Sequence, residues 1–187
     1  AYPEDAHGHL VLGTLYRHLR DFKNAEAELG RSVQLAPNVL QGRLQLGGVY
    51  HDQGRFDAAV EQCEAALALD PRSAPLHLLL GSALWEKGER EAGRKRFEEA
   101  FTLDPNSGIA ANNLAAANAA LGRNLDEALG LAQKARQLAP DLINAADTLG
   151  WIQYKKGLHQ PALPLLEECV KKAPQSATYQ YLSLIHI

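Results

Sequence analysis

Residues 40–73 read LQGRLQLGGVYHDQGRFDAAVEQCEAALALDPRS, and this stretch decides the fold. Its proline belongs to a series that recurs through the chain at intervals of 34 or 35 residues. The members of the series are Pro37, Pro71, Pro105, Pro140 and Pro174. Self-similarity at a fixed period of this length is typical of stacked-repeat proteins. The sequence therefore predicts an array of similar structural units.

Small residues follow the same period, and each has a predicted mechanical role. Two amphipathic helices of about fourteen residues fit each period. Small side chains are expected where helix backbones cross closely, and these positions include Gly13, Gly47, Gly81, Gly150, Ala59, Ala128 and Ala162. A second glycine series, Gly54, Gly88, Gly122 and Gly157, is expected at the turn inside each unit. Each proline of the main series should end the second helix.

Polar residues after each proline suggest where the next helix starts. They are Asn38, Ser73, Ser107, Asp141 and Ser176, and we predict that their side chains cap that helix. Pro161 and Pro164 fall near a predicted helix start. We expect both in the first turn, where the missing N–H has no intrahelical acceptor.

The anchor residues of the quoted stretch carry a resemblance to a known family. They are Leu46, Gly47, Tyr50, Gly54, Phe56, Ala59, Ala66 and Pro71. In this pattern the chain resembles the tetratricopeptide-repeat (TPR) family over essentially residues 1–181. The resemblance implies an all-α fold, a right-handed α-solenoid of helix-turn-helix repeats. It also implies that the first helix of each repeat lines a concave groove that usually binds a peptide or another protein.

The resemblance also divides the chain. Residues 1–5 would end a preceding repeat, five repeats would occupy 6–39, 40–73, 74–107, 108–142 and 143–176, and residues 177–187 would begin a sixth. The fourth repeat carries one inserted residue near Asn124. Residues 182–187 do not fit the register, and two interpretations stay open: a non-native tail similar to translated sequencing adapter, or a degenerate sixth helix. Because the chain contains no methionine, we expect it to be a fragment of a larger protein.

Composition excludes several function classes. Nineteen basic and twenty-two acidic residues give a net charge of −3, which argues against a nucleic-acid binder. No apolar run approaches the eighteen residues of a membrane span.

Cys63 and Cys169 are predicted to be buried thiols that lie too far apart to form a disulfide. No catalytic, phosphate-binding or metal-binding motif is present, so we expect no catalytic residue, no cofactor and no metal.

The family geometry predicts the residues that line the groove. They are Leu44, His51, Leu78, Trp85, Asn112, Asn144, Asp147, Trp151 and Tyr154. TPR domains that grip a C-terminal carboxylate place lysine and asparagine at positions that here are mainly leucine or small, so that clamp is not expected. An apolar groove with a few polar groups suits a peptide with hydrophobic anchors. Packing between first helices remains the alternative role for the leucines and the tryptophans.

The sequence thus favours a non-catalytic scaffold that binds a protein or peptide, with no nucleic-acid partner. One alternative is a substrate-recruiting arm of a larger enzyme, for example a glycosyltransferase, whose catalytic domain lies outside this chain. Another is a spacer that self-associates through its uncapped ends. Residues 112–157 are also similar to large bacterial TPR proteins, including lipoproteins associated with exopolysaccharide export. This similarity suggests a bacterial source and leaves cytoplasm and cell envelope open.

Overall fold

The computed structural model describes residues 5–172, and within them the chain forms α-helices and no strands. The ten helices are α1 (Ala6–His18), α2 (Phe22–Leu35), α3 (Leu40–Asp52), α4 (Phe56–Leu67), α5 (Ala74–Glu86), α6 (Arg90–Leu103), α7 (Gly108–Ala120), α8 (Leu125–Leu138), α9 (Ile143–Lys155) and α10 (His159–Lys172). The predicted all-α fold is confirmed. The predictions for Pro174, Ser176 and the start of a sixth repeat lie outside the described residues.

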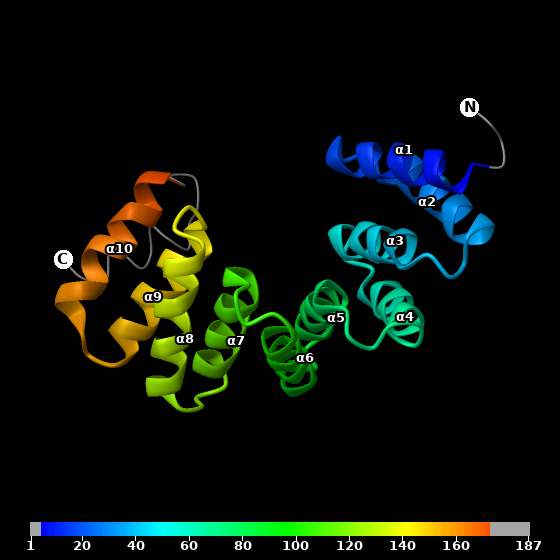
Figure 1. The fold of residues 1–187 in the computed structure, drawn as a ribbon. Helices are drawn as coiled ribbons and strands as arrows, with labels where there is room; N and C mark the ends of the chain where they lie inside the picture. The colour runs from blue at the N-terminus through cyan, green and yellow to red at the C-terminus, as the bar shows by residue number, and fades with distance from the viewer. Residues whose placement is uncertain (1–4, 173–187) are drawn as a thin grey trace. The chain divides into compact units, whose positions relative to one another are not determined.

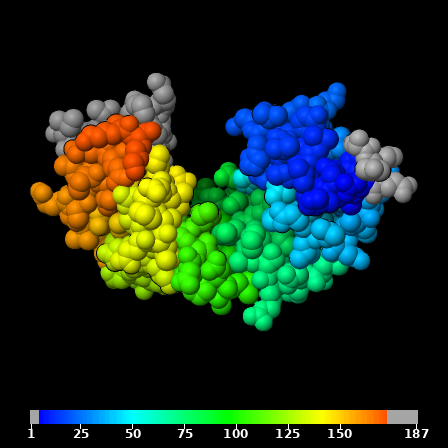
Figure 2. Space-filling model, turned by 45° about the horizontal axis from the view of Figure 1, so that its top comes forward, coloured from blue at the N-terminus to red at the C-terminus, as the bar shows by residue number. Residues whose placement is uncertain are grey.

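The helices form helical pairs within two compact units, Ala1–Leu103 and Asp104–Ile187. In the N-terminal unit α1 packs on α2, α3 on α4 and α5 on α6, and in the C-terminal unit α7 packs on α8 and α9 on α10 (Figure 1). Each first helix also contacts the next first helix of its own unit, α1 with α3, α3 with α5, and α7 with α9. Figure 2 shows α1 and α2, in blue, against the cyan residues of α3. This stacking is the α-solenoid arrangement.

From α3 onward, the first helix of each pair is more buried than the second because it is packed from more sides. In α7 nine of thirteen residues are buried, whereas in α8 only three of fourteen are. The buried residues of α8 are all alanines, and two of them, Ala128 and Ala132, join Leu149 and Ile152 of α9 in one apolar cluster. The helix α1 is the exception, with Gly13 as its one buried residue.

Glycines permit the close helix crossings. A Cβ atom added to Gly81 would lie 2.7 Å from the Phe97 ring, and one added to Gly13 would lie 2.6 Å from Leu29. At Gly93 the nearest atom is backbone, the carbonyl oxygen of Gly81 at 2.8 Å. Added Cβ atoms at Gly47 and Gly150 would meet leucine side chains at 3.2 and 3.0 Å, and Ala59, Ala128 and Ala162 are at most 1% exposed.

The turns within the pairs use a left-handed residue that closes the first helix. Gly54, Gly88, Gly122 and Gly157 have φ angles of +73°, +90°, +66° and +75°. In the α3–α4 turn the N–H of Gly54 donates to His51, and the N–H of Arg55 donates to Tyr50. Glycine takes this conformation without a steric penalty. In the α1–α2 turn the corresponding residue is Arg20, at φ +58°.

Helix starts match the predicted caps only in part. Ser107 accepts a hydrogen bond from the N–H of Ala110, as predicted. Ser73 occupies the cap position of α5 without a side-chain hydrogen bond. For Asn38 and Asp141 the prediction is wrong, because the cap residues are Val39 and Leu142, one residue later.

Two second helices have N-cap residues that the sequence pattern did not predict. Asp21 accepts from the N–H of Asn24 at the start of α2. Asn124, beside the inserted residue, accepts from the N–H groups of Asp126 and Glu127 at the start of α8. Asn124 is therefore the N-cap of α8.

The two prolines of α10 occupy different turns. Pro161 is the third residue of the helix, in the first turn, as predicted. Pro164 is the sixth residue, so the prediction for it is wrong. Its nitrogen cannot donate to the carbonyl of Gln160, and it removes one intrahelical hydrogen bond. The helix starts earlier than the spacing of the prolines suggested.

Candidate functional site

Aromatic rings gather on α9 of the C-terminal unit. The rings of Trp151 and Tyr154 stack with centroids 5.5 Å apart, and Tyr154 lies 5.5 Å from the ring of His159. The ammonium of Lys155 lies 6.0 Å from the Trp151 ring. Trp151 and Tyr154 are half-buried, which leaves part of each ring in contact with solvent. We call these four residues the aromatic patch.

The aromatic patch is fixed to the neighbouring first helix. The ammonium of Lys155 donates to the carbonyl of Ala119 at 2.9 Å, so the end of α9 is tied to the end of α7. Ala119 itself is buried in the apolar cluster of the C-terminal unit. The hydrogen bond therefore fixes the position of Lys155 beside the Trp151 ring.

Polar atoms without partners lie on the same two helices. Asn112 is 5% exposed; its amide nitrogen donates to Asn113 at 3.3 Å, while its Oδ1 atom has no hydrogen-bond partner. Asp147 is half-buried, and its Oδ1 atom also has none. Burial raises the pKa of the Asp147 carboxyl above its ordinary value. Asn144 is exposed on the first turn of α9.

We expect Asp147→Asn to stabilise the protein by on the order of 1 kcal/mol at pH 7, because it removes a buried charge with an unsatisfied oxygen. The raised pKa means that the folded state binds the proton more tightly than the unfolded state. Protonation of Asp147 therefore stabilises the folded state. This stabilisation is fully present below the unfolded pKa of about 4, and it is lost as the pH rises through the folded pKa.

Denaturant titrations of Asp147→Asn at pH 3 and pH 7 test this expectation. The gain should be present at pH 7 and absent at pH 3. Asp141→Asn, at an exposed aspartate of the same unit, is the matched control and should change stability at neither pH. An equal gain for Asp147→Asn at both pH values would contradict the argument.

In the N-terminal unit the predicted groove residues have other contacts. Leu44 packs against the apolar cluster that contains Cys63, Leu76 and Leu80, and Leu78 is half-buried. The Trp85 ring lies 6.4 Å from the Phe97 ring and 5.7 Å from the guanidinium of Arg90, both on α6.

The predicted groove set is thus divided between the two units. His51 contacts Phe56 edge to face at 5.6 Å and lies 3.8 Å from a carboxylate oxygen of Asp52. The structure brings Trp151 and Tyr154 together on α9, which also carries Asn144 and Asp147. It places Leu44, His51, Leu78 and Trp85 in the other unit.

One polar link between first helices was missed by the sequence analysis. Arg17 of α1 donates to Asp52 of α3 at 2.7 Å and to Gln45 at 3.1 Å. Its guanidinium lies against Gly48, where a Cβ atom would collide with it. A signal was present in the sequence, since Gly48 follows the expected Gly47 and adds a second glycine that the period does not require.

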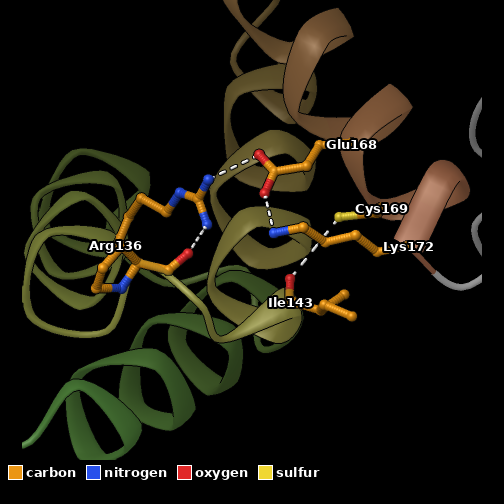
Figure 3. A network of polar contacts seen from close by, with 6 residues as sticks. Arg136, Ile143, Glu168, Cys169 and Lys172 are labelled. Carbon is orange, nitrogen blue, oxygen red and sulfur yellow. Dashed lines mark hydrogen bonds and ion pairs between the residues drawn. The ribbon is translucent and has the colours of Figure 1, made fainter.

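A second polar network joins the outer helices of the C-terminal unit (Figure 3). Arg136 of α8 and Lys172 each lie 2.7 Å from a carboxylate oxygen of Glu168, and Lys172 and then Arg136 lower the pKa of this carboxyl. The thiol of Cys169 lies 3.7 Å from the carbonyl of Ile143. Because these groups satisfy one another, the network ties the helix pairs together.

Both cysteines are free and buried, as predicted. Burial raises the pKa of the Cys63 thiol to about 12 and that of Cys169 to about 11. Residues 5–172 contain no group of three or more histidine, cysteine, aspartate or glutamate side chains that could hold a metal ion. None of the described helices is both long and apolar enough to cross a membrane.

Comparisons with known proteins agree with this architecture. Family models described as TPR or tetratricopeptide repeats match residues 6–39, 47–88, 78–143 and 147–176. A search of curated proteins finds no match. Among solved structures, MamA protein is 25% identical over 93% of this chain and 94% of its own, with a TM-score of 0.70.

Two further solved structures share the fold at lower identity. YrrB, described as a TPR protein with an unusual peptide-binding site, is 20% identical over 97% of this chain and 93% of its own, with a TM-score of 0.69. PilF of Pseudomonas aeruginosa is 22% identical over 93% of this chain and 79% of its own, with a TM-score of 0.81. With four repeat models matched between residues 6 and 176, the chain belongs to the tetratricopeptide-repeat family.

Proposed function

We propose that this chain is a non-catalytic scaffold that binds a peptide segment of a partner protein on the aromatic patch of α9. TPR proteins are generally scaffolds of this kind. The observation that carries the proposal is the stacked pair Trp151–Tyr154, which is half-exposed on α9. The peptide-binding site ascribed to YrrB supports a peptide as the ligand class for this fold.

The physical basis is the accessible aromatic area. Tryptophan and tyrosine are the residues that most often dominate binding energies at interfaces. The unpartnered oxygens of Asn112 and Asp147 are themselves buried, so they are not counted among the contacts with the ligand. The proposed ligand is therefore a peptide with an apolar anchor. A catalytic domain attached elsewhere would leave this proposal unchanged.

The predicted groove residues of the N-terminal unit contribute less to the proposed peptide binding. Leu44 packs in the apolar interior and Trp85 is held between Phe97 and Arg90, so both contribute mainly through the fold. His51 and Leu78 are half-buried and remain proposed contacts for a longer partner segment. Self-association through the chain ends is proposed only as a competing outcome, which light scattering over a range of concentrations would reveal.

A peptide selection followed by affinity measurements tests the proposal. Peptides selected from a random twelve-residue library on the intact chain would be labelled and titrated by fluorescence polarisation. We expect Trp151→Ala to weaken binding by about 30-fold, the loss that corresponds to a hot spot of about 2 kcal/mol. Leu163→Ala, at an exposed leucine of α10, is the control and should leave affinity unchanged. Equal effects of the two variants, or none, would reject the aromatic patch as the site.

A further inference from the structure

A cavity of the N-terminal unit includes no residue of the aromatic patch and has no role in the proposed function. Its volume is about 410 Å³. It is lined by the end of α1, the α1–α2 turn, the start of α2 and the end of α3. The lining residues are Arg17, His18, Arg20, Phe22 and Asp52. Three of these five side chains are basic and one is acidic.

The backbone conformation at Arg20 is uncommon for a residue other than glycine. The turn has the same hydrogen bonds as the α3–α4 turn: the N–H of Arg20 donates to Arg17 and that of Asp21 to Tyr16, both at 2.9 Å. Counting back 34 residues from Gly54 leads to Arg20, and the other four turns have glycine there. At φ +58° arginine is strained where glycine is not. Strained backbone of this kind is concentrated at functional sites.

Some charged side chains of the cavity are paired with neighbouring residues, and others are not. Asp52 and Gln45 fix the guanidinium of Arg17 in place. The guanidinium of Arg20 lies 5.5 Å from the centroid of the Phe22 ring. Across residues 5–172, neither Arg20 nor His18 forms an ion pair with a carboxylate. The single acid of the cavity is therefore occupied, while Arg20 and His18 are available to an anion.

The end of α1 does not oppose an anion at this place. Helix C-termini disfavour negative charge because their last carbonyls are unsatisfied. Here the carbonyls of Leu15, Tyr16 and Arg17 accept hydrogen bonds from the N–H groups of the turn. Three of the last four carbonyls of α1 are thus already occupied, which reduces their repulsion of an anion.

We propose that this cavity binds an acidic peptide segment, with a carboxylate held by Arg20 and His18 and an adjacent apolar side chain on the Phe22 ring. A guanidinium group binds a carboxylate through paired, charge-assisted hydrogen bonds, and an imidazole N–H can donate one more. A free inorganic anion would use Arg20 and His18 but would leave the Phe22 wall and most of the cavity unfilled. The site belongs to the N-terminal unit, so its test is independent of the test of the aromatic patch.

Arg20→Gly is the decisive variant, because it removes the guanidinium and relieves the backbone strain together. The probe is a fluorescein-labelled ten-residue peptide of four glutamates, two phenylalanines and four glycines, with a glutamine-for-glutamate peptide beside it. On the intact chain the acidic probe should bind at least tenfold more tightly than its glutamine counterpart. Arg20→Gly should lose at least tenfold in affinity for the acidic probe while its melting temperature rises.

Arg55→Ala is the matched control, since it removes one exposed positive charge at the next turn without touching the cavity. Its affinity for the acidic probe should stay within twofold of the unmodified chain. An equal loss of affinity for Arg55→Ala and Arg20→Gly would mean that the probe responds only to the net charge of the protein. That result would overturn the proposal. Unchanged binding by Arg20→Gly would overturn it too. So would an Arg20-dependent site for inorganic phosphate that the acidic probe does not enter. None of these results would alter the outcome for Trp151→Ala.

Discussion

Gly93→Ala is expected to destabilise the protein by about 2–3 kcal/mol, although it adds one methyl group to a helix. The added Cβ would lie 2.8 Å from the carbonyl oxygen of Gly81 and 3.0 Å from the nitrogen of Trp85. Both atoms belong to the backbone of α5, so no side-chain rotation can relieve the contact. The helices α5 and α6 must separate, and the apolar contacts between them weaken.

Denaturant unfolding of Gly93→Ala and Gly130→Ala measures this effect against a matched control. Gly130 lies inside α8 with no atom within 4 Å of an added Cβ. Alanine there should stabilise by about 0.5–1 kcal/mol, because glycine is the poorer helix former. Two variants with the same chemical change should therefore shift stability in opposite directions. A neutral or stabilising Gly93→Ala would refute the close crossing of α5 and α6.

The second large effect is expected for Trp85→Ala, which should cost about 2–3 kcal/mol of folding stability. The indole packs on Phe97, which is 4% exposed, and truncation would leave a void between α5 and α6. Trp151→Ala should cost less than about 1 kcal/mol, since the neighbours of its ring, Tyr154 and Lys155, are half-buried and exposed. Thermal unfolding followed by circular dichroism compares the two variants directly. Equal losses would mean that both rings are structural.

Much of the fold could be predicted from the sequence because its determinants are local and repeated. Period, turn glycines and small crossing residues all act within one helical pair, and each recurs often enough to be recognised. Helix starts were less certain, because a cap depends on one residue: Val39 and Leu142 occupy cap positions one residue after Asn38 and Asp141. Pro164 was placed in the first turn of α10 for the same reason, because the start of that helix was expected too late.

The candidate site was harder to predict than the fold. Family positions indicate which residues lie on first helices, but side-chain packing decides which of them remain accessible. Leu44, Trp85 and Trp151 are all half-buried, but Leu44 and Trp85 pack against buried residues, whereas Trp151 stacks on the half-buried Tyr154. Arg20 departs from the glycine series of the turns, so the recurring pattern did not point to it. The informative feature there is the absence of a glycine that the period predicts.

The central claim is that a peptide binds the aromatic patch, and fluorine NMR tests it most directly. The chain has two tryptophans, so 5-fluorotryptophan labelling gives two signals, which Trp85→Phe and Trp151→Phe would assign. Titration with a selected peptide should shift the Trp151 signal, since the ligand contacts that ring, and leave the Trp85 signal in place. A shift confined to Trp85, or no shift of either signal at saturation, would contradict the account.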